Sequence, residues 1–448
     1  MPALLSKPFS LFQDLLAKRF IRNVLILAGG TAAAQTLSLL LVPFITRLYS
    51  PAMFGHLGVF LSLVAILQVP ALTGYHRAIP VCKSSDAAAA LTLICGSTIL
   101  IVTALASMFS FLYGERISTW VDPTLACMLP FVPCAALAAA TYELATFCAV
   151  RNHHYRSLSF TKFAYAGGSS SVQLALGIFA FGAPGLVIGE LLGRAVSAAI
   201  LTISVLRGEW DRLRSTSFRV VVGTARQQVR FVIFGAPYLL TNQAGLYLPT
   251  LMLSICCGAK EAGAFFLAQR ALQLPLAMIG RSVARVFLGE AAELWRTDPE
   301  QLHNLFQQTC HNLFKLAAIP MLGVAFFGPQ LFGWLLSEQW AIAGQYGRIL
   351  AIPVLINFAV APAMQALTII QREDWLLYWG IARVVFTTMA IALPASIGLS
   401  PIVSMIAFAI ATAVTYVLGY RLVDHLLKCS PRASAFNTGR ASPLTRAA

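Results

Sequence analysis

The sequence predicts an all-α integral membrane protein with about twelve transmembrane helices arranged in two six-helix lobes. Three observations carry this prediction. Of the 448 residues, 58% are hydrophobic and only 11% are charged, whereas a soluble domain carries about 25% charged residues. Long apolar runs recur along the chain, and each can cross a bilayer, which takes about 20 residues at about 1.5 Å of rise per residue. The first helical hairpin also has a counterpart about 200 residues further on.

The hairpin at residues 23–80 is the first element of the predicted fold. It consists of two long apolar runs with a proline near the end of each, Pro43 and Pro70. A tight polar turn at 49–51 joins the two runs. Each proline removes one helical hydrogen bond, so it supplies a point at which the helix can bend.

A weaker version of this hairpin recurs in the second half of the chain. The matched pairs, in order, are Gly29 with Gly235, Gln35 with Thr241, Pro43 with Pro249, Gly55 with Gly263, and Pro70 with Pro275 to within about three residues. Because these matches come at the start of each six-span half, they indicate a duplication. Six spans bring both halves into the membrane from the same side, so the predicted repeat is parallel, as in several secondary transporters.

The remaining apolar runs complete the predicted set of spans and divide the chain into domains. The spans are placed at about 23–46, 53–72, 87–113, 124–149, 162–183, 185–205, 229–256, 262–281, 314–336, 346–370, 375–397 and 401–423. The predicted domains are a cytoplasmic interfacial helix at 1–22, an N-terminal lobe at 23–206, a cytoplasmic linker at 207–228, a C-terminal lobe at 229–424 and a disordered cytoplasmic tail at 425–448. A capping threonine and Pro299 also predict a helix start ahead of the ninth span.

Basic residues are distributed unevenly between the two sides of these spans. With the N-terminus inside, 25 Lys and Arg residues fall in inside segments and 4 in outside segments. This bias predicts cytoplasmic termini by the positive-inside rule. The net charge of +15, which in a soluble chain would suggest nucleic acid, is therefore assigned to orientation in the membrane, and no nucleic-acid partner is expected.

Charged residues inside the predicted spans are the first candidates for a binding site. A charge at the bilayer centre costs about 2.5–3.5 kcal/mol on insertion scales, so each one needs a reason. Arg270 and Arg383 lie deep in the eighth and eleventh spans, and Arg194 lies in the sixth span, four residues after Glu190. An arginine guanidinium group can donate two parallel hydrogen bonds to a pyrophosphate or a carboxylate. These residues therefore predict a cationic cavity between the lobes, with Arg270 as the first candidate.

Each of these residues also has a structural interpretation. Arg383 can form a salt bridge with another helix or reach toward the cytoplasm, and Glu190 and Arg194 can neutralise each other. Arg47, at the outer end of the first span, is a candidate for substrate release or an interfacial anchor.

Two further groups of polar residues lie in the spans. Five polar residues on the leading helices of the two halves are expected to bond sugar hydroxyls or neighbouring helices: Gln35, Asn242, Gln243, Gln269 and Gln273. Glu143 and Glu190 are the acids within the spans, so we predict that one of them couples transport to a proton or sodium gradient, unless both serve in structural hydrogen bonds. The nine cysteines have no CxxC or metal-ligand spacing, and neither a metal site nor a cofactor is expected.

Four stretches resemble the oligosaccharide flippase family of bacterial membranes. This family is the polysaccharide-export branch of the superfamily that also holds the multidrug and toxin extrusion transporters and the lipid II flippases. The stretches are RLYSPAMFGHLGVFLSL at 47–63, GYHRAIPV at 74–81, RNHHYRSLS at 151–159 and AQRALQLPLAMIGRSVARVFLGEAAEL at 268–294. The chain departs from the family pattern at His76, where an acidic residue is common.

The resemblance implies a V-shaped fold of two six-helix lobes in the bacterial inner membrane. It also implies outward flipping, by alternating access, of a sugar repeat unit on a polyprenyl pyrophosphate carrier for surface polysaccharides such as lipopolysaccharide O-antigen or exopolysaccharide. A polysaccharide polymerase and a chain-length regulator are the protein partners that it suggests.

Two other functions are weighed against the flippase. A small-molecule or drug exporter of the same superfamily shares the predicted layout. A membrane glycosyltransferase, polymerase or ligase would need a substantial external loop with catalytic acids, whereas the predicted external turns are short and their acids dispersed. No P-loop is present, so direct use of ATP is not expected. We therefore predict a transporter without catalytic residues.

Overall fold

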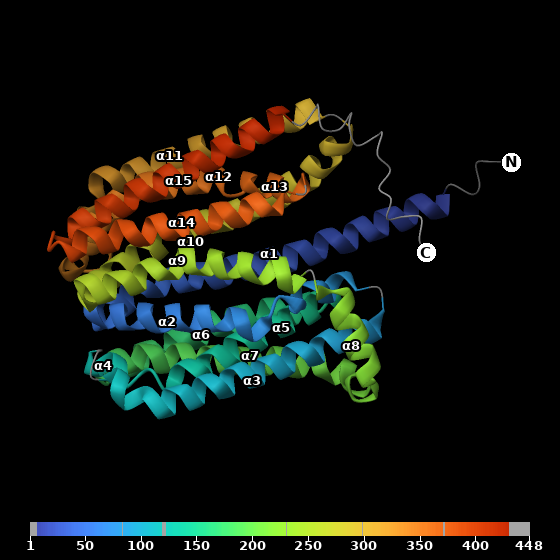
Figure 1. The fold of residues 1–448 in the computed structure, drawn as a ribbon, viewed down its shortest axis with the longest axis horizontal. Helices are drawn as coiled ribbons and strands as arrows, with labels where there is room; N and C mark the ends of the chain where they lie inside the picture. The colour runs from blue at the N-terminus through green and yellow to red at the C-terminus, as the bar shows by residue number, and fades with distance from the viewer. Residues whose placement is uncertain are drawn as a thin grey trace. The chain divides into compact units, whose positions relative to one another are not determined.

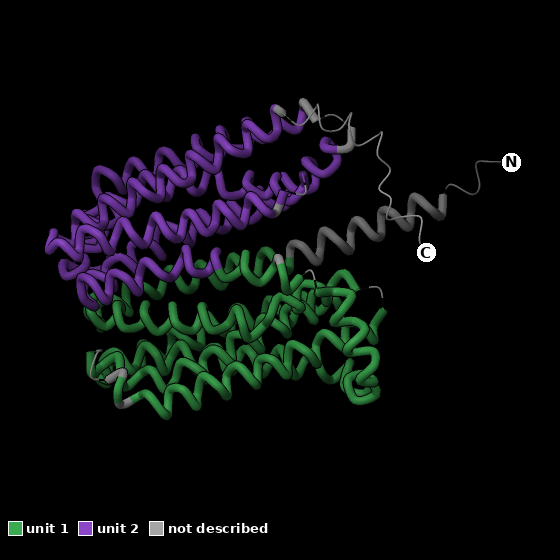
Figure 2. Tube along the Cα trace, in the orientation of Figure 1, with its two compact units in different colours: residues 1–240 green, residues 241–448 purple. Residues whose placement is uncertain are grey.

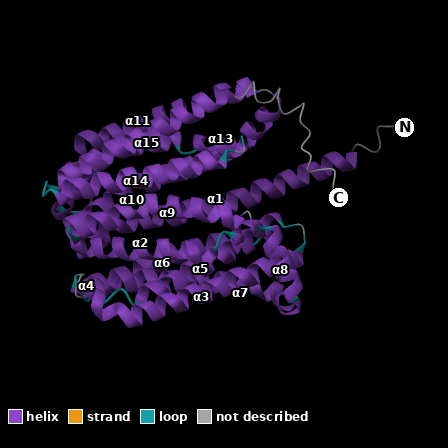
Figure 3. Cartoon of the chain, viewed as in Figure 1, coloured by secondary structure: helices purple, strands orange, loops and turns teal. Residues whose placement is uncertain are grey.

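The chain is an assembly of long helices in the computed structural model, which describes residues 7–429 except 83, 119–121, 230, 298 and 371. No strand occurs among these residues, and twelve of their helices have 20 residues or more (Figures 1 and 3). The predicted all-α fold is therefore confirmed.

The chain forms two compact units, residues 1–240 and 241–448 (Figure 2). The long helices up to residue 215 are α1 (Lys7–Leu48), α2 (Pro51–Leu72), α3 (Ser85–Ser118), α5 (Phe131–Arg151), α6 (Tyr155–Ile178) and α7 (Ala183–Ser215). Shorter helices between and after them are η1 (Tyr75–Val81), α4 (Pro123–Ala126), α8 (Phe218–Gln227) and η2 (Phe231–Gly235).

The division between the units falls inside α9 (Ala236–Cys257). The other long helices of the second unit are α10 (Ala259–Thr297), α11 (Pro299–Leu335), α12 (Ala341–Val360), α14 (Glu373–Ser396) and α15 (Pro401–Cys429). Its short helices are η3 (Glu338–Trp340), η4 (Ala363–Gln365) and α13 (Ala366–Ile369). Within this unit α12 packs against α10, α11 and α15, and α14 packs against α15.

Ten helices of the described part are long and apolar enough to cross a membrane. The two remaining long helices, α6 and α9, have 24 and 22 residues, which suffices in length, but they are more polar. In α6 the polar side chains of Ser159, Ser169 and Gln173 are buried in the protein. A helix whose polar groups face protein does not need the hydropathy of a helix that faces lipid.

Several predicted boundaries differ from those observed. The predicted spans at 124–149 and 346–370 are each interrupted, the first between α4 and α5 and the second after Val360, where η4 and α13 follow. In contrast, α1 runs without a break from Lys7, so the predicted interfacial segment and the first span form one helix. The predicted tail begins within α15, and its residues from 430 onward lie outside the described part.

The turn of the first hairpin is held by Tyr49 and Ser50. Ser50 is the N-cap of α2, because its hydroxyl accepts a hydrogen bond from the Met53 N–H at 3.4 Å. Tyr49 is 1% exposed, and its hydroxyl donates to the Gln173 carbonyl of α6 at 2.7 Å. A Cβ at Gly185 would lie 2.8 Å from that hydroxyl, so the glycine allows α7 to approach. The motif at 47–51 therefore fastens the hairpin to α6 and α7.

Replacing Tyr49 by phenylalanine is expected to lower the free energy of unfolding by about 1–2 kcal/mol. The substitution removes one buried hydrogen bond and leaves the Gln173 carbonyl without that donor. Denaturant titration of the purified protein measures the change. Tyr113→Phe is the matched control because Tyr113 is 44% exposed, and an equal loss in both variants would contradict this assignment.

Two other family-like stretches meet at η1. The Arg151 guanidinium donates to the carbonyl oxygens of Ile79, Cys82 and Ser84 at 2.9, 2.7 and 3.1 Å. His76 is buried with its ring 4.9 Å from that of Phe147. Burial lowers the pKa of His76 to about 4, so the side chain at this position is neutral near pH 7. Both stretches thus shape one end of the first unit.

Candidate functional site

The side chain of Arg383, on α14, is buried in the second unit. The residue is 7% exposed, and its guanidinium donates to the Tyr416 hydroxyl at 2.7 Å and to Asn242 Oδ1 at 3.5 Å. The guanidinium carbon lies 5.0 Å from the Trp379 ring centroid and 5.8 Å from that of Tyr416. Aromatic faces stabilise the cation without cancelling its charge.

Within the described part of the chain, Arg383 forms no salt bridge with a carboxylate. Its Nε is buried and has no hydrogen-bond partner among the residues that the structure describes. A Cβ at Gly245 would lie 2.4 Å from Nη2, so this glycine leaves the guanidinium its space. A buried arginine without a counter-ion is costly in a membrane, which marks it as a candidate for binding an anion.

A small cavity of about 40 Å³ lies beside this guanidinium. The residues that line it come from α9, α10, α12, α14 and α15, and they include Gln269, Gln273, Asn357, Thr387, Thr412 and Tyr416. The Thr412 hydroxyl, like Arg383 Nε, is buried without a partner. This space has room for a few water molecules or one small group, and its walls offer hydrogen-bond donors and acceptors.

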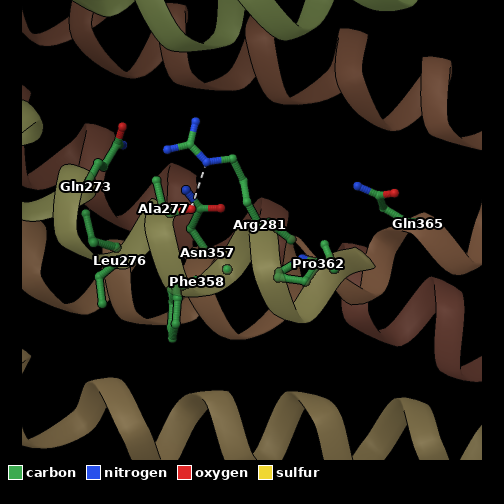
Figure 4. A pocket seen from close by; sticks show the side chains of 12 residues that line it. Gln273, Leu276, Ala277, Arg281, Asn357, Phe358, Pro362 and Gln365 are labelled. Carbon is green, nitrogen blue, oxygen red and sulfur yellow. Dashed lines mark hydrogen bonds between the residues drawn. The ribbon is translucent and has the colours of Figure 1, made fainter. Parts of the chain in front are cut away.

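A larger cavity of about 270 Å³ lies between α10, α12 and η4. The two cavities share Gln273, Val354 and Asn357 in their walls. Figure 4 shows Gln273, Arg281 and Gln365 projecting to the same side of the helices, whereas Leu276 and Phe358 project to the other. A cavity of this size is close to the lower limit of small-molecule sites.

Prolines interrupt the helices that form these walls. Pro275 lies inside α10 and Pro353 inside α12, and Pro362 follows the end of α12. A proline inside a helix leaves one carbonyl without its usual donor and bends the axis. The points at which these helices can bend therefore lie beside the two cavities.

The structure brings together three of the predicted contacts, Arg383, Gln269 and Gln273, in the wall of the small cavity. Arg270 is half-buried on the same helix, lines neither cavity and has no hydrogen bond or ion pair with the described residues. Successive residues of a helix point about 100° apart, so Gln269 and Arg270 face different surroundings. The role of Arg270 stays a prediction.

Two further predicted contacts, Arg47 and Gln35, lie on α1 in the first unit. Arg47 is exposed in the last turn of the helix. Gln35 is partly buried, and its Oε1 has no hydrogen-bond partner. Neither lines a cavity described above, and their roles as substrate contacts stay predictions.

Glu190 and Arg194 form an ion pair within the first unit. Arg194 Nε and Nη2 lie 2.9 and 2.8 Å from Glu190 Oε1. Tyr165 also donates to Glu190 Oε1, and Ser169 donates to Oε2 at 3.3 Å. The glutamate side chain is 4% exposed and that of the arginine 25%. With its lone pairs occupied and its charge matched, this pair fits the predicted internal neutralisation.

Glu143, the other predicted coupling acid, is half-buried on α5. Lys162 and Arg77 are the cations that act on its carboxylate. Lys162 also donates to the Thr31 hydroxyl at 3.1 Å. A coupling role for Glu143 stays a prediction.

Three polar residues of the larger cavity were not selected from the sequence: Arg281, Asn357 and Gln365. Arg281 falls at the predicted inner end of the eighth span, where the positive-inside rule already explains an arginine. Asn357 and Gln365 are isolated amides in an apolar run. The spacing of Gln269, Gln273 and Arg281 at multiples of four was the one available signal.

A comparison with protein families matches residues 44–345 to the model of a family described as polysaccharide biosynthesis proteins. Among curated proteins, the succinoglycan biosynthesis transport protein ExoT of Rhizobium meliloti (strain 1021) is 23% identical over 422 residues. The match covers 91% of this chain and 80% of ExoT. The predicted family resemblance is confirmed by these matches.

Solved transporters share the fold. An inward-facing multidrug resistance transporter of the MATE family aligns with a TM-score of 0.71 and 14% identity, over 89% of this chain and 96% of the other. A MOP superfamily transporter from Pyrococcus furiosus, described as having a binding pocket of reverse polarity, aligns at 0.60 and 14% identity, over 91% and 96%. The Vibrio cholerae MATE transporter VcmN, in a mutant form, aligns at 0.58 and 15% identity, over 94% and 98%. At these identities the likeness establishes a MATE-type fold.

Proposed function

Because the chain belongs to the family of polysaccharide biosynthesis proteins, we propose that it flips polyprenyl-pyrophosphate-linked oligosaccharide repeat units across the bacterial inner membrane. The flipped units would supply a polymerase and a chain-length regulator that assemble a surface polysaccharide. The MATE-type fold supports alternating access as the mechanism. The relation to ExoT, whose name assigns it to succinoglycan transport, supports a polysaccharide precursor as cargo.

The observation that carries the proposal is the Arg383 guanidinium, which has no carboxylate partner among the described residues and lies beside a cavity lined by amides and hydroxyls. A pyrophosphate-linked sugar offers anionic oxygens to such an arginine and hydroxyls to such amides. Neutral lipids would gain nothing from the charge. A substrate with both chemistries therefore fits this site better than a purely apolar one.

Deletion of the gene tests the proposal in cells. The expected result is loss of the surface polymer and accumulation of the lipid-linked repeat unit on the cytoplasmic side of the membrane. Analysis of surface polysaccharide and of lipid-linked intermediates measures both. Unchanged polymer with no trapped repeat unit would overturn the flippase proposal.

A drug exporter is the second candidate function, since the solved structures of the same fold include multidrug resistance transporters. It predicts that deletion leaves the polymer intact and that cells lacking the protein accumulate more dye. An enzyme of the same pathway is less well supported, because the relative and the solved neighbours are described as transport proteins.

A further inference from the structure

A row of residues on α10 connects the two cavities of the second unit. The row consists of Gln269, Gln273, Ala277 and Arg281, at intervals of four residues, so each lies beside the next and the row turns by about 120° around the helix from first to last. Gln269 lines the small cavity, Gln273 lines both, and Ala277 and Arg281 line the larger one. Twelve residues of helix cover about 18 Å, which is more than half of the roughly 30 Å hydrocarbon core.

Arg281 lines the larger cavity, and its terminal amino groups are available to a ligand there. Its Nε donates to the Ala277 carbonyl at 3.0 Å, which holds the side chain against its own helix (Figure 4). Its terminal amino groups have no hydrogen bond or carboxylate partner among the described residues. Two parallel N–H groups on one guanidinium match two oxygens of a phosphate group.

The rest of the larger cavity divides into a polar and an apolar wall. Gln273, Asn357 and Gln365 supply amides near the arginine. The apolar wall consists of aliphatic, aromatic and small residues: Leu276, Gly280, Ala284, Val354, Phe358 and Pro362. A ligand that fits both walls has an anionic head and an apolar chain joined to it.

We propose that Arg281 and Arg383 are two successive stations for one lipid-linked diphosphate. The diphosphate binds first at Arg281, with the first isoprene units of its carrier on the apolar wall. It then moves past Gln273 and Asn357, which line both cavities, toward Arg383. The assignment rests on the proposed flippase function and adds the residues that bind the head group during its transfer.

The two cavities differ in the size of group that they admit. The cavity of about 270 Å³ at Arg281 accommodates a diphosphate with part of its lipid, whereas the cavity of about 40 Å³ at Arg383 does not. The second station must therefore widen before it receives the head group. The proline-interrupted helices α10 and α12, which form walls of both cavities, provide the element that can bend.

Binding of farnesyl diphosphate to the purified full-length protein in nanodiscs tests the first station. Arg281→Ala is expected to weaken this binding by roughly tenfold or more, because it removes a charge-assisted bidentate contact. Arg281→Lys keeps a positive charge but not the paired N–H groups of the guanidinium. Its affinity for farnesyl diphosphate is expected to lie between those of the wild type and Arg281→Ala. Arg285→Ala is the matched control, since Arg285 lies one turn further on the same helix and does not line the cavity. It should change the affinity less than twofold.

Other ligands identify the chemistry that the site recognises. Farnesol is expected to bind weakly and with the same affinity in the wild type and in Arg281→Ala. Binding of inorganic diphosphate is expected to depend on Arg281 and to be weaker than binding of farnesyl diphosphate. Equal binding of the free and the lipid-linked diphosphate would overturn the role of the apolar wall. Displacement by phosphatidylglycerol at similar concentrations would overturn selectivity for a diphosphate over any lipid phosphate.

Arg383→Met separates the two stations. It should leave farnesyl diphosphate affinity within about threefold, while flipping of the lipid-linked substrate in vesicles falls at least tenfold. Equal loss of binding in Arg383→Met and Arg281→Ala would overturn the two-station order in favour of one site.

If Arg281→Ala binds and flips like the wild type, the first station is refuted while the flippase function stands. If the wild type binds the diphosphate through Arg281 without flipping it, the site stands and the flippase function is refuted.

Discussion

Replacing Arg383 by methionine is expected to lower the transport rate by roughly 10- to 100-fold and to leave the protein as stable as the wild type or more so. Loss of a hydrogen bond to a charged group costs about 1.5–3 kcal/mol in the interaction with an anionic substrate, and each 1.4 kcal/mol is tenfold. The folded protein loses a buried cation that has no counter-ion and gains an apolar side chain of similar length. Transport assays and thermal inactivation of the purified variant measure the two effects.

The two effects distinguish a functional arginine from a structural one. If Arg383 served only to hold α14 against α15 through Tyr416, methionine would lower stability and transport together. Arg383→Lys is expected to keep part of the transport rate. The positive charge remains, but the two guanidinium hydrogen bonds to Tyr416 and Asn242 are lost. Arg348→Ala is the control for loss of positive charge, since Arg348 is exposed on α12 and lines neither cavity.

Replacing Glu190 by glutamine is expected to destabilise the first unit by about 2–4 kcal/mol. The change leaves the Arg194 guanidinium without its carboxylate in a site where the partner is nearly buried. The expected cost lies toward the lower part of the range for buried pairs because a quarter of the Arg194 side chain is exposed. The free energy of unfolding measures this change.

A second substitution provides the control for Glu190. The double variant Glu190→Gln with Arg194→Met should recover most of the lost stability, because no uncompensated charge is left. A gradient-coupling role predicts a different pattern: Glu190→Gln would keep normal stability and abolish the response of transport to a proton or sodium gradient. That result would contradict the structural ion pair.

The helical fold was predictable because the bilayer allows few alternatives. Apolar length and the polar turn at 49–51 locate the end of α1 and both ends of α2 within a few residues, whereas α1 begins at Lys7 and not near residue 23. Interruptions were harder to predict, because the residues on both sides of a break can be equally apolar. After Val360 the sequence APAMQALTI remains apolar, so hydropathy does not register the end of α12.

The candidate site was predictable only where its chemistry was unusual for its place. Arg383 stands out as a charge within an apolar run, and Gln269 as an amide on a leading helix. Arg281 does not stand out, because an arginine at the inner end of a span is ordinary. Whether a charge is neutralised also depends on packing. Glu190 is bonded by Tyr165 and Ser169 of the preceding helix, α6, a contact that hydropathy does not predict.

Flipping of a lipid-linked oligosaccharide by the purified protein tests the central claim most directly. The protein is reconstituted into vesicles with a fluorescent polyprenyl-pyrophosphate oligosaccharide confined to one leaflet, and the fraction reaching the other leaflet is followed by quenching. We expect flipping to exceed that of protein-free vesicles and to fall at least tenfold in Arg383→Met. A rate equal to that of protein-free vesicles, from protein that is folded and correctly inserted, would contradict the account.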